Sequence, residues 1–162
     1  MPGHHLPMAM LGTFILLFGW FGFNAASTLS ATDVQFATVA TNTVISGAFG
    51  AVASMLWITK RTGKPNPAMM INGMLAGLVA ITAPCAFVAP WAAAVIGSIA
   101  AVLVIESTYF LEERLRIDDP CGAISVHGVC GMFGLLSVGV FANGSYGAGW
   151  NGSESTGVAG II

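Results

Sequence analysis

Long runs without any charged side chain constrain the fold of this chain more than any other feature. Such runs cover residues 6–26, 36–59, 65–105 and 120–141. A helix needs about 20 mostly apolar residues to cross the hydrocarbon core of a bilayer. Charged residues make up 7% of the chain, whereas soluble domains carry roughly 25%. The chain therefore lacks the charge that would cover a soluble surface, and we expect an all-α polytopic membrane protein.

The longest uncharged run divides into two helices. Residues 65–105 are about twice as many as one span requires. Pro84 and Pro90 interrupt this run, and proline both removes a backbone donor and disfavours a helix before it. The sequence therefore predicts five transmembrane helices, at about residues 6–26, 36–59, 67–83, 91–110 and 120–141.

The basic residues predict the orientation in the membrane. All five fall into two loops, with Lys60, Arg61 and Lys64 after the second helix and Arg114 and Arg116 after the fourth. These loops lie on one side of a five-helix bundle, and loops rich in Lys and Arg stay in the cytoplasm. We therefore expect a cytoplasmic N-terminus and an extracytoplasmic C-terminus for this segment in a cell membrane.

Several function classes are disfavoured by what the sequence contains. The net charge of −2 offers no basic surface for nucleic acid. The cysteines (Cys85, Cys121 and Cys130) have no CxxC spacing, and no His and Glu stand at metal-binding spacing. No Ser or Cys is evidently paired with a base. We therefore expect no enzyme, no metal and no cofactor.

His127 lies near the middle of the membrane in the fifth predicted helix. It follows Pro120 by seven residues, which is roughly 10 Å of helix at 1.5 Å per residue. The imidazole has two interpretations: a hydrogen-bonding group between helices, or a substrate-contacting group that relays protons. Gly128, Gly131 and Gly134 keep the neighbouring backbone thin, which favours a narrow apolar passage beside the ring.

Aromatic residues and a hydroxyl gather at the end of the first helix. Trp20, Phe21, Phe23 and Ser27 follow one another there. They fit an aromatic belt at the membrane interface. They also fit a site for a small cation, held by ring faces and one hydrogen bond. Trp20 lies about two turns deeper than Ser27, which is below the usual position of a belt.

Three carboxylates lie near the expected cytoplasmic ends of the fourth and fifth helices. Asp118 and Asp119 precede Pro120 and are either solvated charges or a cap for the fifth helix that fixes His127. We favour the cap. Glu106 is expected to extend to water from the end of the fourth helix.

The sequence resembles the ammonium transporter (Amt/Rh) family along nearly its whole length. The resemblance is carried by His5-Leu6-Pro7 and by residues 18–27, 72–79, 81–85, 116–120 and 126–131, with a similar tail at 146–152. It implies two inverted five-helix repeats and a further helix, assembled as a homotrimer. Residues 1–162 look like the second repeat, helices six to ten, and therefore like a partial domain. Inverted repeats enclose their site at the interface between them.

The resemblance also implies roles for individual residues. His127 is similar to the second of two paired pore histidines, and Ser27 to the hydroxyl of an outer ammonium-recruiting site. Phe23 is similar to one of two stacked gate phenylalanines, Trp20 to a pore-lining tryptophan, and Asp119 to a structural carboxylate before the histidine helix. Ala26 departs from the family, where many members have glycine.

The function implied is an ammonium/ammonia channel or transporter. Its partners would be ammonium or ammonia, with methylammonium as an analogue, the lipid bilayer, copies of itself in a homotrimer and a cytoplasmic regulatory protein. Two alternatives also fit this sequence: the membrane domain of an ammonium sensor, and a non-conducting scaffold.

Overall fold

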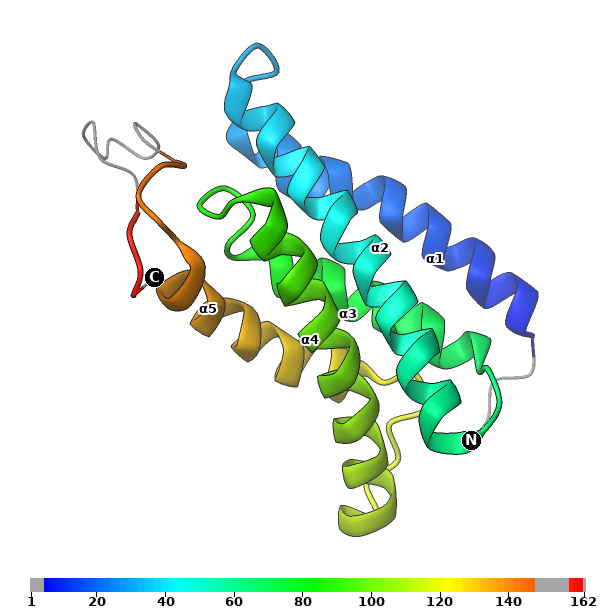
Figure 1. Cartoon of the computed structure of the whole chain (residues 1–162). Helices are drawn as coiled ribbons and strands as arrows, with labels where there is room; N and C mark the ends of the chain where they lie inside the picture. Colours follow the sequence, from blue (N-terminus) through cyan, green and yellow to red (C-terminus); the bar gives the residue numbers. More distant parts are fainter. Residues whose placement is uncertain (1–4, 148–157, 162) are drawn as a thin grey trace.

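The computed structural model describes residues 5–147 and 158–161, and helices make up nearly all of this part (Figure 1). The predicted all-α membrane fold is confirmed. The tail at 146–152 lies outside the described residues from 148 onward. The α-helices are α1 (Leu6–Trp20), α2 (Val34–Thr62), α3 (Pro67–Thr82), α4 (Pro90–Tyr109) and α5 (Cys130–Phe141).

Shorter helical segments of other types extend three of these helices. α1 continues through a π-helical segment, η1 (Phe21–Ala25), into a 3₁₀ turn, η2 (Ala26–Thr28). α4 continues as the π-helical η3 (Phe110–Leu115), and the π-helical η4 (Ile124–Val129) precedes α5. Within the described part, four continuous helices are long and apolar enough to cross a membrane: Leu6–Thr28, Val34–Thr62, Pro90–Leu115 and Ile124–Phe141. The apolar helix Pro67–Thr82 is shorter, at 16 residues.

The helix boundaries follow from local capping chemistry. The Asn66 side chain accepts hydrogen bonds from two backbone N–H groups at the start of α3, where Pro67 is the first helical residue. Gly63 ends α2 with a φ of 76°, a left-handed conformation that glycine adopts without steric cost. The fifth span begins at Ile124 rather than at Pro120. The reason is a turn at residues 119–122, closed by the Gly122 N–H donating to the carbonyl oxygen of Asp119 at 2.8 Å, in which Gly122 has a φ of 68°.

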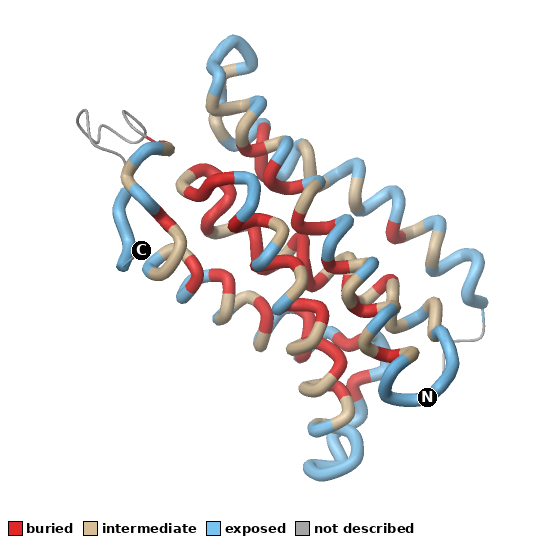
Figure 2. Tube along the Cα trace, viewed as in Figure 1, coloured by how far each residue is buried: buried red, intermediate tan, exposed pale blue. Residues whose placement is uncertain are grey.

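Close backbone contacts at glycines hold α2, α3 and α4 together. A methyl group added to Gly73 would lie 2.7 Å from the carbonyl oxygen of Gly50, and one added to Gly97 would lie 2.9 Å from Cα of Ser46. The Ser46 hydroxyl also donates to the carbonyl of Gly77, at 2.8 Å. Small residues allow such close approach between membrane helices. Buried positions accordingly concentrate along these three helices (Figure 2).

α1 packs much more loosely than these three helices. Only 6% of its most apolar window is buried, and Phe14, Ile15 and Phe18 are exposed. Among the residues that the structure describes, two side-chain hydrogen bonds connect the first span to the bundle. Asn24 in η1 donates to Thr43 of α2 at 3.1 Å, and Trp20 donates to Thr82 of α3 at 3.0 Å.

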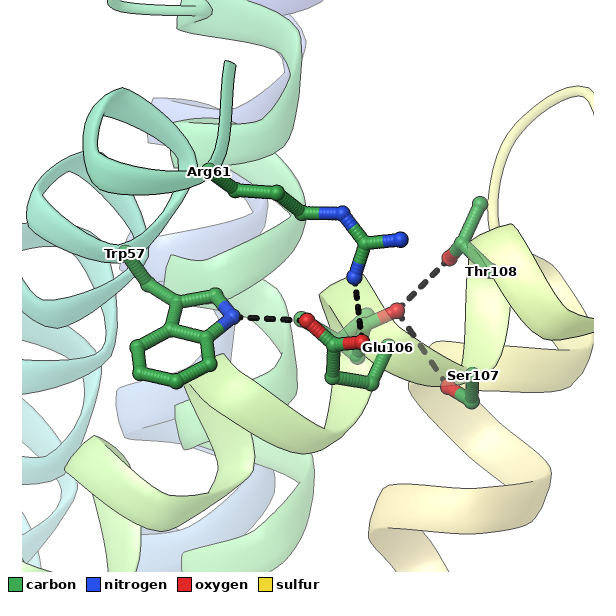
Figure 3. Close-up of polar contacts among 6 residues, drawn as sticks. Trp57, Arg61, Glu106, Ser107 and Thr108 are labelled. Atoms are coloured by element: carbon green, nitrogen blue, oxygen red, sulfur yellow. Dashed lines mark hydrogen bonds and ion pairs between the residues drawn. The ribbon is translucent and has the colours of Figure 1, made fainter. Parts of the chain in front are cut away.

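A polar cluster joins α2 to α4 near the ends of both helices (Figure 3). The indole Nε1 of Trp57 donates to Oε1 of Glu106 at 2.8 Å, and Arg61 pairs with the other carboxylate oxygen. The Arg61 guanidinium also lies 4.3 Å from the centroid of the Tyr109 ring. Glu106 therefore binds α2, while 44% of its side chain stays exposed. Trp57 and Arg61 are four residues apart on α2, so they present one face to this carboxylate.

Candidate functional site

A cavity of about 760 Å³ is lined by α1, α3 and α5, of which α1 and α5 each pack against α3. Its wall includes Trp20 and Phe23 from the end of the first span, Thr82 from α3, and His127 from η4. The remaining lining consists of glycine, alanine and aliphatic side chains. Residues from three distant parts of the chain thus form one nearly apolar wall with very few polar atoms.

His127 reaches this cavity from a π-helical turn. η4 spans Ile124–Val129, and His127 is exposed on the side that lines the cavity. The imidazole has no hydrogen-bonding partner among residues 5–147 and 158–161. A methyl group added to Gly131, one turn further on, would approach nothing closer than 3.8 Å. The ring is therefore available to a substrate or to groups that this part of the chain does not supply.

Asp119 stands at the beginning of the helix that carries His127. Its side chain is only 4% exposed. Its carboxylate accepts hydrogen bonds from the backbone N–H of Ile124, at 3.1 and 3.2 Å, and of Ser125, at 3.2 Å. A carboxylate at a helix N-terminus satisfies free N–H groups and interacts favourably with the helix dipole.

Trp20 and Phe23 form an aromatic corner of the cavity. Their ring centroids are 5.8 Å apart, with an interplanar angle of 60°. The Trp20 side chain is half-buried, and its N–H is bound to Thr82. Phe23 is exposed, so the corner faces open space on one side.

Ser27 lies one helical turn beyond this corner. It belongs to η2, is exposed, and does not line the cavity. Its hydroxyl donates to the carbonyl oxygen of Phe23. Within the described part of the chain, no three His, Cys, Asp or Glu side chains gather as a metal site would require.

The sequence matches the model of the Ammonium Transporter Family over residues 1–161. The chain belongs to the ammonium transporter family. It is therefore a multi-pass membrane segment.

Relatives within the family agree in sequence and in fold. The chain is 53% identical over 146 residues to "Ammonium transporter Amt2" of Archaeoglobus fulgidus, which covers 90% of the chain and 31% of that relative. The solved structure "Sensor Amt Protein" matches with a TM-score of 0.85 and 43% identity, over 93% of this chain and 37% of that one. "Crystal structure of Saccharomyces cerevisiae Mep2" matches with a TM-score of 0.87 and 33% identity, over 97% and 34%. The chain thus spans about a third of the length of these ammonium transporter family members.

The structure brings together some of the residues that the sequence singled out. Trp20, Phe23 and His127 line one cavity, whereas Ser27 and Asp119 lie outside it, beyond the aromatic corner and at the start of the histidine helix. Thr82 was given no role from sequence, although it lies in one of the stretches that resemble the family. Its place in the cavity wall becomes evident only from the structure, in which it accepts a hydrogen bond from Trp20.

Proposed function

We propose that the complete protein containing this chain carries ammonium nitrogen across a cell membrane. The observation that supports the proposal best is the cavity wall, in which His127 is combined with the Trp20 and Phe23 rings and otherwise apolar side chains. The family model and the archaeal relative carry the name of transporters. This favours transport over the sensor and scaffold alternatives.

The chemistry of the wall favours passage of the neutral molecule. A bare cation is costly in an apolar, water-poor passage. Ammonium can leave its proton behind and cross as ammonia, whereas K⁺ cannot lose its charge. The ring faces and the Ser27 hydroxyl would hold ammonium at the outer end, and Phe23 would act as a gate.

His127 would guide ammonia through the middle of the passage. A neutral imidazole offers one donor and one acceptor, and ammonia can bind either. The same group can relay a proton. The unpartnered state of the ring among the described residues leaves both nitrogens available for these roles. Asp119 would hold the histidine helix in place through its bonds to Ile124 and Ser125.

The open side of the cavity needs a second wall. We propose that residues outside this chain supply it, since the relatives are about three times as long. In the family arrangement this wall belongs to an inverted repeat. From the resemblance to the family, we also propose that the complete protein assembles as a homotrimer and binds a cytoplasmic regulatory protein.

Uptake of methylammonium tests the proposed activity. Cells lacking their own ammonium uptake, and expressing the complete reading frame that contains this chain, are expected to accumulate labelled methylammonium. Excess ammonium should compete with it, and excess K⁺ should not. Accumulation no greater than in cells with an empty vector would refute the proposed transport.

Thiol labelling tests the proposed orientation. Cys121 is exposed and close in sequence to the basic Arg114 and Arg116, so we expect it on the cytoplasmic side. A membrane-impermeant maleimide should label it in inverted vesicles and not in intact cells. Cys121→Ser should abolish this signal. Labelling from the outside alone would reverse the orientation.

Cys85 provides an internal reference in the same experiment. It lies in the connection between α3 and α4, where its side chain is 5% exposed. Burial raises the pKa of the Cys85 thiol to about 12. Because maleimide reacts with the thiolate, Cys85 should remain unlabelled from either side at neutral pH.

A further inference from the structure

The only polar group of the Trp20 side chain is occupied by a residue from another helix. Indole has one donor, its Nε1–H, and no conventional acceptor. This N–H donates to Oγ1 of Thr82 at 3.0 Å, across 62 residues of sequence. Both side chains line the cavity that contains His127. The direction of the bond therefore affects what the cavity presents to a substrate.

Thr82 is held in the state in which it can only accept from Trp20. Its hydroxyl proton is donated to the carbonyl oxygen of Leu78 on the same helix, at 2.8 Å. The oxygen lone pairs then face the indole N–H. The order of donors is thus fixed along the series from Trp20 through Thr82 to Leu78.

We infer that Thr82 is a positioning residue that withholds the Trp20 N–H from the substrate. This inference rests on the proposed function. With the N–H bound, the indole presents a π face to the passage and no free donor. A free donor would bind the lone pair of ammonia and delay its movement. Thr82 also fixes the angle of the ring at the aromatic corner with Phe23, 5.8 Å away.

Thr82→Val tests the inference because valine keeps the branched shape and removes the hydroxyl. In the complete reading frame, we expect the maximal rate of methylammonium uptake to fall roughly fivefold to tenfold, the ratio that corresponds to one hydrogen bond. The KM should change less than the maximal rate, because both aromatic rings and the Ser27 hydroxyl of the outer site are retained in this variant. Thr82→Ser keeps the hydroxyl and should restore the rate.

A matched control and a double variant separate this role from general packing. Thr59→Val removes a hydroxyl that bonds only within α2, to Met55 at 2.7 Å, away from the cavity. It should leave uptake unchanged. In a Trp20→Phe background, which has no indole N–H, Thr82→Val should add little further loss. An undiminished loss in that background, or a failure of Thr82→Ser to restore the rate, would overturn the inference.

The indole signal gives a readout that is independent of transport. In protein labelled with ¹⁵N at tryptophan, the Trp20 N–H resonance is identified by its loss in Trp20→Phe. It should be protected from hydrogen exchange in the parent protein and in Thr82→Ser, and should shift and exchange faster in Thr82→Val. This measurement stands even if the parent protein fails to transport methylammonium. Rapid exchange of the Trp20 N–H in the parent protein would disprove the inference without any variant at Thr82.

Discussion

His127→Ala in the complete reading frame is expected to reduce methylammonium uptake by at least about tenfold, as loss of a positioned proton-transferring or hydrogen-bonding group does. The cavity wall around this residue is almost entirely apolar. Alanine would remove from this wall, beside Gly131, the imidazole that is proposed to relay a proton. Initial uptake rates, normalised to the amount of protein in the membrane, measure this effect.

A second variant on the same helix controls for changes in folding. Leu136→Ala shortens a side chain of α5 that is 70% exposed and does not line the cavity, so uptake should stay close to that of the parent. Competition by K⁺ should be measured in parallel, because a passage without the imidazole can also lose selectivity. Uptake that remains ammonium-selective and undiminished in His127→Ala would remove the role assigned to this residue.

Asp119→Ala is expected to destabilise the protein by about 2 kcal/mol, the range observed when a helix cap or a hydrogen bond to a charged group is lost. The carboxylate is buried and accepts from the N–H groups of Ile124 and Ser125. Without it these donors lose their partner, and the turn that leads to His127 loosens. Thermal unfolding in detergent, followed by the loss of monodisperse protein, measures the change.

Two further variants separate the cap from its charge. Asp119→Asn keeps an acceptor oxygen and should be less destabilising than Asp119→Ala. Glu113→Gln neutralises an exposed carboxylate of η3 and should change the unfolding temperature very little. We propose that this cap positions His127, so Asp119→Ala should also lower uptake. An unfolding temperature equal to that of the parent would contradict the structural role of Asp119.

The arrangement of spans could be predicted because it depends on composition. Uncharged runs mark what the bilayer accepts, and the division at Pro84 and Pro90 agrees with a helix that ends at Thr82 and another that starts at Pro90. The start of the last span was predicted too early. The cause is local: Asp119 does not cap the next residues but reaches Ile124, five positions on, over a turn that Gly122 closes.

The partners of the polar side chains could not be predicted from spacing. A threonine such as Thr82 inside an apolar helix usually bonds its own backbone, and Thr82 does so. The hydrogen bond that it accepts comes from Trp20, which is far away in sequence. Glu106 is similar: its position near a helix end predicts an exposed side chain, and 44% of it is exposed, but nothing local predicts its partners Trp57 and Arg61 on the neighbouring helix. Such contacts follow from helix packing and not from the local sequence.

The glycine contacts among α2, α3 and α4 affect the entropy of assembly in the bilayer. Gly50, Gly73 and Gly97 have no rotatable side chain, so these helices approach without freezing side-chain torsions at the points of closest contact. Water contributes no driving force between helices that are already in lipid, which leaves dispersion and carbonyl contacts to favour association. Little side-chain entropy is therefore lost where these three helices contact one another. This helps α2, α3 and α4 to form a stable bundle, which supports the cavity wall that contains Thr82.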